Sequence, residues 1–345
     1  MNKILFSVIK YLLILSIGGV LLWLAFRGVR LRDTIEEIRG ANFFWIFLSV
    51  LVSLVAFFSR SLRWNMLIEP LGYHPRPMNT SAALMIGYLA NLAVPRLGEV
   101  TRCGTLSRTE KVPFEALLGT VIIERIIDVI CLLLLIAGVA IVESERLGSF
   151  LFTNIFNPAT AKFRAAVNSP LAITLLASVV ILLIVFLARR KFSGGILKKI
   201  GGLLRGVMNG VDTVRRLKNP FGFIFHTVLI WAMYFLMSYT CFFSLQATTS
   251  LGLSAGMFVL VVGGIGMSAP VQGGIGAYHL LVSQGLILYG IAQDHGLAFA
   301  TLMHTSQTLV VIFFGGLAFL YLFLKKRNAE IKHTGNNQGE DSHEG

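Results

Sequence analysis

Six long apolar runs dominate this sequence of 345 residues. A helix needs roughly 20 apolar residues to cross a membrane core about 30 Å thick, and these runs approach or exceed that length. Hydrophobic residues make up 55% of the chain and charged residues only 14%, a composition that excludes an ordinary soluble domain. The runs therefore predict an all-α polytopic membrane protein. We expect spans at residues 4–26, 43–62, 114–142, 170–188, 221–245 and 298–324, within one transmembrane domain of residues 1–327 and before a disordered cytoplasmic tail at 328–345.

Two shorter apolar stretches are interrupted by one pattern, small-x-Pro-x-x-Gly. The first interruption contains Pro95 and Gly98, and the second contains Pro270 and Gly273. In lipid, a backbone that stops being helical leaves N–H and C=O groups unsatisfied, so it survives only where protein buries it or water reaches it. Paired breaks in the two halves of a chain are typical of transporters built from repeats, whose binding site lies near the bilayer midplane.

Basic residues set the expected orientation. The net charge of +13 could suggest nucleic acid, but the cations concentrate beside the apolar runs, above all in residues 189–218 and 325–327. The positive-inside rule places both stretches in the cytoplasm. We therefore expect a protein of the cytoplasmic (inner) membrane with both termini in the cytoplasm. By the same rule, the cation-rich stretches 60–79 and 96–113 are expected to be cytoplasmic loops.

Three apolar pieces are too short to span comfortably: residues 80–94, 253–269 and 275–291. With loops on the same side before and after it, the first piece must enter the membrane and return. The other two form a region without Lys or Arg, which fits a broken hairpin dipping from the external face. One hairpin from each side would be an inverted repeat.

Several ionisable residues lie at or near membrane depth. An Arg or Asp at the centre of a spanning helix costs roughly 2.5–3.5 kcal/mol on insertion scales, so such residues often mark function. Arg60 and Arg63 share one helix face, and Glu124, Arg125 and Asp128 are spaced to pair within one helix. The alternatives are basic anchors that snorkel to the interface and a buried ion pair that only fixes helix packing.

Each break carries candidate binding residues. Asn91, Arg96, Glu99 and Arg102 surround the first one, and Arg is suited to bidentate contact with phosphate. The competing interpretation is an exposed turn with ordinary cytoplasmic charges.

The second break carries no charge and offers Gln272, Gly273, Gly274, Tyr278 and His279. Its glycines permit close backbone approach, and free N–H groups at the following helix start can receive an anion. The histidines are scattered without metal-ligand spacing, and no hydrolytic or redox motif is present. We therefore expect no metal, no cofactor and no enzymatic activity. The scattered histidines are His226, His279, His295 and His304.

Four ordered motifs together resemble one family. They are Arg60-x-x-Arg63-Trp64, the run from Asn91 to Arg102, Glu124-Arg125-Ile126-Ile127-Asp128, and the run from Pro270 to Gly276. The chain is similar, from about residue 7 to 325, to the flippase-like membrane domain of lysylphosphatidylglycerol synthases in a stand-alone form. Many relatives carry a glutamate where this sequence has His279.

The resemblance implies translocation of an anionic lipid, of phospholipid or polyprenyl-phosphate type, across the cytoplasmic membrane. Arg96, Arg102 and one of Arg60 or Arg63 would hold the phosphate, and the nearby carboxylates would pair with them in the empty site. Because the chain ends about twenty residues after the last apolar run, we expect no aminoacyltransferase domain. Two alternatives stay open: a non-transporting component of a polyprenyl-linked glycosyltransferase system, and a permease for a small soluble anion. A homo-oligomer or a lipid-modifying enzyme partner also stays open.

Overall fold

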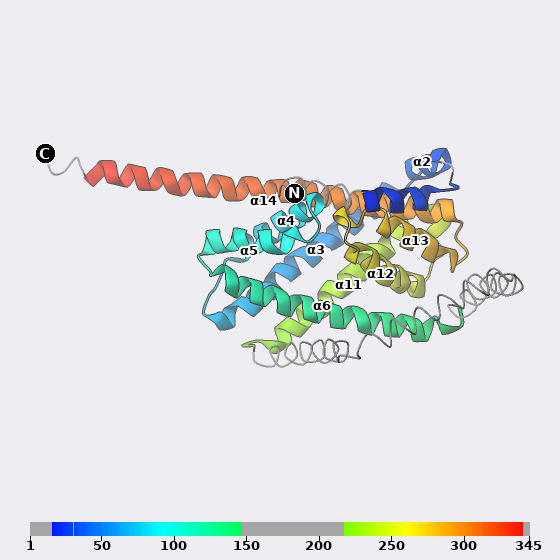
Figure 1. The fold of residues 1–345 in the computed structure, drawn as a ribbon, viewed down its shortest axis with the longest axis horizontal. Helices are drawn as coiled ribbons and strands as arrows, with labels where there is room; N and C mark the ends of the chain where they lie inside the picture. The colour runs from blue at the N-terminus through cyan, green and yellow to red at the C-terminus, as the bar shows by residue number, and fades with distance from the viewer. Residues whose placement is uncertain (1–15, 30, 147–216, 341–345) are drawn as a thin grey trace, which may run out of the picture.

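The computed structural model describes residues 16–29, 31–146 and 217–340, and all regular structure in these ranges is helical (Figure 1). An apolar helix, Ser16–Phe26, comes first. The α-helices that follow are α2 (Leu31–Arg39), α3 (Phe43–Ile68), α4 (Pro77–Ala93), α5 (Leu97–Glu110), α6 (Phe114–Val142), α11 (Pro220–Phe242), α12 (Leu253–Ser268), α13 (Ala277–Ile287) and α14 (Gln293–Glu340). Short 3-10 turns are η1 (Glu69–Leu71), η3 (Gln246–Thr248) and η4 (Gln272–Gly274).

Four described helical segments are long and apolar enough to cross a membrane: Phe43–Leu71, Phe114–Val142, Pro220–Phe242 and Gln293–Asn328. They confirm the predicted spans at 43–62, 114–142, 221–245 and 298–324, and they make the protein an all-α polytopic membrane protein. The predicted span at 4–26 is described only from Ser16 onward. The span at 170–188 and almost all of the basic stretch 189–218 lie outside the described residues.

The surface of these spans suits lipid. Large apolar side chains on α6 and α11 stay exposed in the folded chain, among them Leu134 at 67% and Phe225 at 61%. In water such a surface would be a liability, but in a bilayer it contacts acyl chains of equal polarity. The exposed apolar belt therefore agrees with the composition.

Three stretches differ from expectation. Residues 60–68, the first part of the expected loop 60–79, are the end of helix α3, because Arg60 and Arg63 are buried inside the protein and not exposed at the cytoplasmic surface. Residues 96–113 are mostly helix α5 and not a loop, because the polar residues that make this stretch look loop-like include Arg102, whose buried side chain pairs inside the protein. The backbone of α14 also stays helical to Glu340, through most of the expected disordered tail. Extending an existing helix adds one hydrogen bond per residue without a new nucleation cost.

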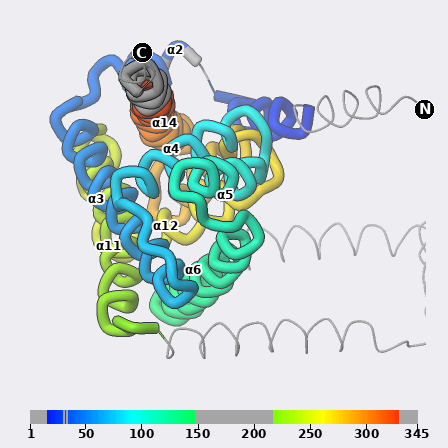
Figure 2. The backbone as a smooth tube through the Cα atoms, turned by 90° about the vertical axis from the view of Figure 1, so that its left-hand side faces the viewer, coloured from blue at the N-terminus to red at the C-terminus, as the bar shows by residue number. Residues whose placement is uncertain are grey.

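The helices pack as neighbouring pairs. Figure 2, which looks along α14, shows α3 beside α11, with α5 and α6 on the opposite side. The pair α4 and α5 forms one hairpin, and α12 and α13 form the other. Helix α14 packs against both α4 and α13 and so touches both hairpins.

Two apolar clusters hold these pairs together. One buries Phe242, Leu286 and Phe299 where α11, α13 and α14 meet. The other buries Trp64 and Leu106 where α3, α5 and α6 meet. The second cluster supports the candidate site.

The two breaks meet in space. Turn η4, in the second break, contacts α4, which leads into the first. A Cβ added at Gly273 would lie 2.9 Å from Cδ2 of Leu92, so the Leu92 side chain fills the space between the two backbones. Segments about 180 residues apart in sequence thus form one contact.

Candidate functional site

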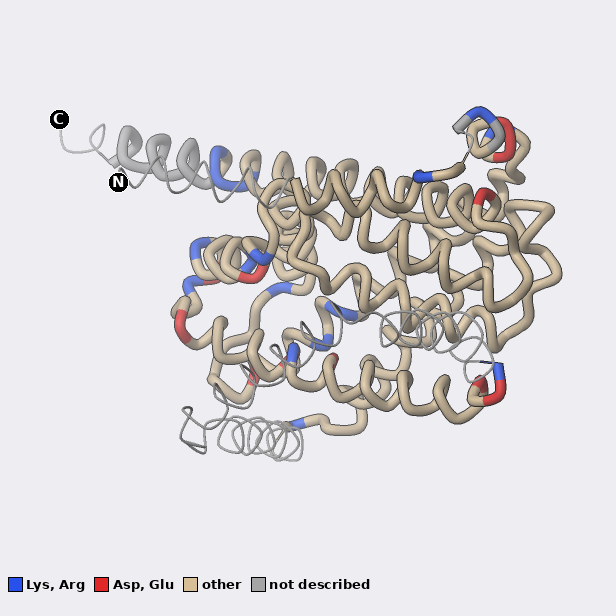
Figure 3. The backbone as a smooth tube through the Cα atoms, turned by 45° about the vertical axis from the view of Figure 1, so that its right-hand side comes forward, with Lys and Arg blue, Asp and Glu red and all other residues tan. Residues whose placement is uncertain are grey.

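Six charged residues from three helices form a cluster inside the helical body, which we call the arginine cluster. Figure 3 shows Lys and Arg positions and Asp and Glu positions inside the helical body as well as at the ends of helices. Arg63 and Glu124 are fully buried, and Arg60 and Arg102 are 6% and 3% exposed. The side chains of Asp128 and Arg125 are 16% and 41% exposed, so the cluster has one accessible edge. Its members are Arg60 and Arg63 of α3, Arg102 of α5, and Glu124, Arg125 and Asp128 of α6.

Glu124 is the centre of the arginine cluster. Its Oε1 accepts hydrogen bonds from Nη2 of Arg60 and Nη2 of Arg125, both at 2.8 Å. Nη1 of Arg102 lies 3.0 Å from the other carboxylate oxygen, as an ion pair without hydrogen-bond alignment. Arg63 approaches to 3.8 Å. One carboxylate therefore joins α3, α5 and α6.

Asp128 lies one turn further along α6. It accepts from Nη2 of Arg60 at 2.7 Å and from Nη2 of Arg63 at 2.6 Å. Helix α11 completes this side: the Tyr234 hydroxyl accepts from Arg60 Nη1 at 2.9 Å, and Thr227 Oγ1 lies 3.4 Å from Arg63 Nη1. The two arginines of α3 are thus held in fixed orientations by two other helices.

The charges of the arginine cluster do not balance. Four guanidinium groups face two carboxylates, which leaves two positive charges without a counter-charge among its members. Several buried N–H donors also lack hydrogen-bond partners: Nη2 of Arg102, Nε of Arg125 and Nε of Arg63. Buried polar groups are normally satisfied, so this combination of excess charge and unused donors is what an anion would complete.

Trp64 positions Arg102. The guanidinium carbon of Arg102 lies 4.6 Å from the centre of the Trp64 ring, a cation–π arrangement. The indole Nε1 donates to Thr120 Oγ1 at 2.9 Å, which fixes the ring against α6. The arginine of α5 is therefore held by an aromatic face, while one end of its guanidinium keeps free donors.

The first break is a tight turn between α4 and α5. Arg96 has φ of 63° in the left-handed region, and Asn91 Oδ1 accepts from the Gly98 N–H at 2.6 Å. Gly98 also packs against Gly87, so closely that a Cβ on either glycine would meet the carbonyl oxygen of the other. The Arg96 side chain is exposed, and Glu99 has a buried Oε2 without a hydrogen-bond partner.

The second break is built from glycines and histidines. Gly273, Gly274 and Gly276 all have positive φ, which glycine adopts without steric cost. The ring of His304 donates from Nε2 to the Gly273 carbonyl at 2.7 Å. The ring of His279 lies 4.9 Å from that of His304, and its Nδ1 is buried without a partner.

The structure thus divides the fourteen predicted site residues. Arg60, Arg63, Arg102, Glu124, Arg125 and Asp128 come together in the arginine cluster. Asn91, Arg96 and Glu99 stay at the first break, and Gln272, Gly273, Gly274, Tyr278 and His279 stay at the second. Within the described part of the chain, no hydrogen bond or ion pair joins the second break to the arginine cluster.

Sequence reasoning missed two partners of the arginine cluster and one contact between histidine rings. Tyr234 and Thr227 on α11 contact the arginines, but a single hydroxyl in an apolar run carries no distinctive signal. The rings of His279 on α13 and His304 on α14 are also neighbours, which their sequence spacing did not indicate. No motif links the two positions in the sequence, so their contact becomes visible only from the packing of α13 against α14.

The family model for the lysylphosphatidylglycerol synthase TM region matches residues 7–315. The chain belongs to this family. This confirms the resemblance drawn from the four motifs, all of which lie in the matched range.

One relative is similar over a shorter stretch. It is the UPF0104 membrane protein MJ1595 of Methanocaldococcus jannaschii, 28% identical over 131 residues. That alignment covers 37% of this chain and 38% of the relative, so the chain matches less than half of the relative's length. No solved structure matches the chain. The family membership indicates a membrane protein with a lipid-related role.

Proposed function

We propose that this chain moves an anionic lipid across the membrane and that the lipid's phosphate binds in the arginine cluster. The observation that carries the proposal is the excess of two positive charges in the arginine cluster, three of whose four arginines are buried. Burying an unpaired charge is expensive, and such charges in membrane helices mark substrate paths. A phosphate with one or two negative charges would balance this excess.

The unused donors fit that ligand. Nη2 of Arg102 and Nε of Arg125 lack partners, and guanidinium groups bind phosphate oxygens in a planar, bidentate manner. Arg125 is the member with an exposed edge, so a headgroup would reach it first. In the empty state, Glu124 and Asp128 hold the arginines, which keeps four like charges from repelling one another.

The paired breaks supply a route for movement. Both hairpins end in irregular backbone, and they touch through Leu92 and Gly273. In transporters with paired broken helices, one half rocks against the other around a fixed site. We propose the same for this chain, in the cytoplasmic membrane with both termini in the cytoplasm, and we propose no enzymatic step.

The test is translocation by the purified chain in vesicles that contain fluorescent phosphatidylglycerol or, as a neutral-headgroup comparison, phosphatidylcholine. Arg125→Gln should slow phosphatidylglycerol movement at least tenfold, because a charged hydrogen bond contributes about 1.5–3 kcal/mol. Arg125 is the best position for this change, since three other arginines still pair with Glu124. Arg108→Gln, on the exposed side of α5, is the matched control and should move lipid at the wild-type rate.

Two results would contradict the proposal. Equal translocation by the wild type and Arg125→Gln would remove the arginine cluster from the path. No lipid movement by the wild type, with saturable uptake of a soluble anion or a stable complex with a glycosyltransferase, would favour the two alternative functions.

A further inference from the structure

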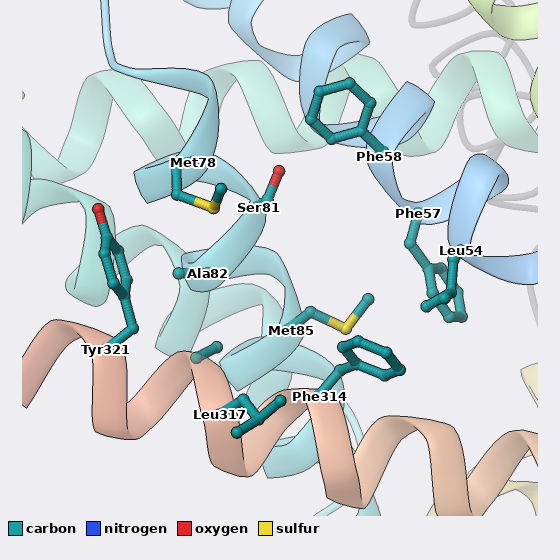
Figure 4. A pocket seen from close by; sticks show the side chains of 11 residues that line it. Leu54, Phe57, Phe58, Met78, Ser81, Ala82, Met85, Phe314, Leu317 and Tyr321 are labelled. Atoms are coloured by element: carbon teal, nitrogen blue, oxygen red, sulfur yellow. The ribbon is translucent and has the colours of Figure 1, made fainter.

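A groove of about 310 Å³ runs between α3, α4 and α14 (Figure 4). It opens to the outside of the helical body, since Met78, Phe58 and Leu317 on its rim are 62%, 51% and 46% exposed. Only two of the lining side chains, Ser81 and Tyr321, carry a polar atom. The lining residues are Leu54, Phe57, Phe58, Met78, Ser81, Ala82, Met85, Phe314, Leu317, Ala318 and Tyr321.

The Tyr321 end of the groove is polar and basic. The Tyr321 hydroxyl donates to Oδ1 of Asn79 at 3.1 Å, and Nζ of Lys325 donates to the same oxygen at 3.0 Å. Asn79 is itself 1% exposed, and its amide donates to Glu110. Among the residues that the structure describes, Lys325 forms no ion pair, so its ammonium has donors to spare beside an apolar groove.

The position along α14 matches a lipid at the membrane surface. The apolar sequence of α14 ends at Leu324 and is followed directly by Lys325, Lys326 and Arg327, and such a basic run at the end of a span lies at the level of the headgroups. From Tyr321 back to Phe314 the groove follows α14 for about 10 Å, at 1.5 Å per residue. Because α3 and α14 are membrane spans, the groove faces the hydrocarbon of the bilayer. The surrounding lipids therefore supply an acyl chain as its occupant.

We infer that the groove binds one acyl chain of an anionic phospholipid whose phosphate pairs with Lys325. The charge of Lys325 selects the anionic headgroup, and the apolar lining accepts the chain beneath it. This site shares no residue with the arginine cluster and does not depend on the proposed function. A lipid held here would rest against α4, which leads into the first break.

The test uses phospholipids with a photoactivatable diazirine on one acyl chain, added to the full chain in vesicles. Labelled phosphatidylglycerol and phosphatidylcholine with the same acyl chains are compared, and the crosslinked residues are mapped by peptide mass spectrometry. We expect labelling of Met78, Phe314 and Leu317, with phosphatidylglycerol about fivefold above phosphatidylcholine, the preference that one Lys near an anionic headgroup provides. Lys325→Gln should reduce this ratio to about one.

Leu317→Trp fills the groove and should abolish groove labelling. Leu320→Trp is the matched control, because Leu320 is on the same helix, is 50% exposed and does not line the groove. It should label as the wild type does. Equal labelling by the two lipids in the wild type would overturn the inference without any variant, and so would unchanged labelling in Leu317→Trp. Translocation in the same vesicles is measured separately, so failure of one proposal does not disguise failure of the other.

Discussion

The two breaks have the same sequence pattern and different construction. At the first, the reversal uses a non-glycine residue, Arg96, in the left-handed region, and the side chain of Asn91 binds the Gly98 N–H. At the second, three glycines take the positive φ values and the His304 ring binds a backbone carbonyl. A shared proline and glycine therefore specify that the helix stops, whereas the neighbouring residues decide how the chain turns.

The charges divide in the same way. All six members of the arginine cluster lie on α3, α5 and α6 of the first half, and the second break has no charged side chain within residues 268–279. Buried ion pairs hold position by strong but costly interactions, while glycine and histidine contacts are weaker. We therefore expect the first half to lose more stability than the second when one contact is removed.

The largest expected effect is at the centre of the arginine cluster. Glu124→Gln should lower the free energy of unfolding by about 3–5 kcal/mol, because it leaves buried arginines without their common counter-charge. The measurement is denaturant unfolding of the purified protein in micelles. Glu115→Gln, at an exposed position in the first turn of the same helix, is the control and should be close to neutral. A loss below 1 kcal/mol for Glu124→Gln would mean that the cluster does not stabilise the first half.

A smaller effect is expected at the first break itself. Gly98→Ala should cost about 1–3 kcal/mol, since its Cβ would press on the Gly87 carbonyl and on Asn91. Gly104→Ala lies on the same helix with nothing within 4 Å of the new Cβ, and should be neutral or slightly stabilising through helix propensity. Equal thermal midpoints for both variants would show that α4 and α5 are not in close contact.

The smallest effect is expected at the second break. His304→Phe keeps a ring beside Tyr278 but removes the donor to the Gly273 carbonyl, at a cost of about 1 kcal/mol. Hydrogen exchange of the Ile275 amide, which bonds to the Gln272 carbonyl, should then be about fivefold faster. His74→Phe, in the exposed stretch before α4, should leave this exchange rate unchanged. A larger loss of stability than in Gly98→Ala would reverse the comparison between the two halves.

Local sequence patterns predicted most of the fold. Apolar length identified the four described spans, and the pairs Pro95/Gly98 and Pro270/Gly273 located both breaks, because each signal is contained in one short window. Spacing within one helix also indicated that Glu124, Arg125 and Asp128 act together, which the structure shows in part: Arg125 bonds Glu124 and lies 3.7 Å from Asp128.

Contacts between distant helices could not be predicted. The other partners of Glu124 and Asp128 are Arg60, Arg63 and Arg102, about 22 to 68 residues away, and nothing in the sequence pairs one cation with one acid. For the same reason, residues 96–113 were expected to be a loop and not helix α5: a buried arginine such as Arg102 cannot be told from an exposed one in the sequence. The contact of His304 with Gly273 could not be predicted either, since it depends on the packing of α13 and α14.

The contact between Leu92 and Gly273 has a consequence for how this chain can vary. A side chain at position 273 would occupy the space that Leu92 fills, and the positive φ of Gly273 would strain it, so a larger residue there requires both a smaller residue at 92 and a change in the turn. Residues in the two halves that are far apart in the gene must then change together. In related chains, covariation between these two positions would be evidence that the two hairpins are in contact there as well.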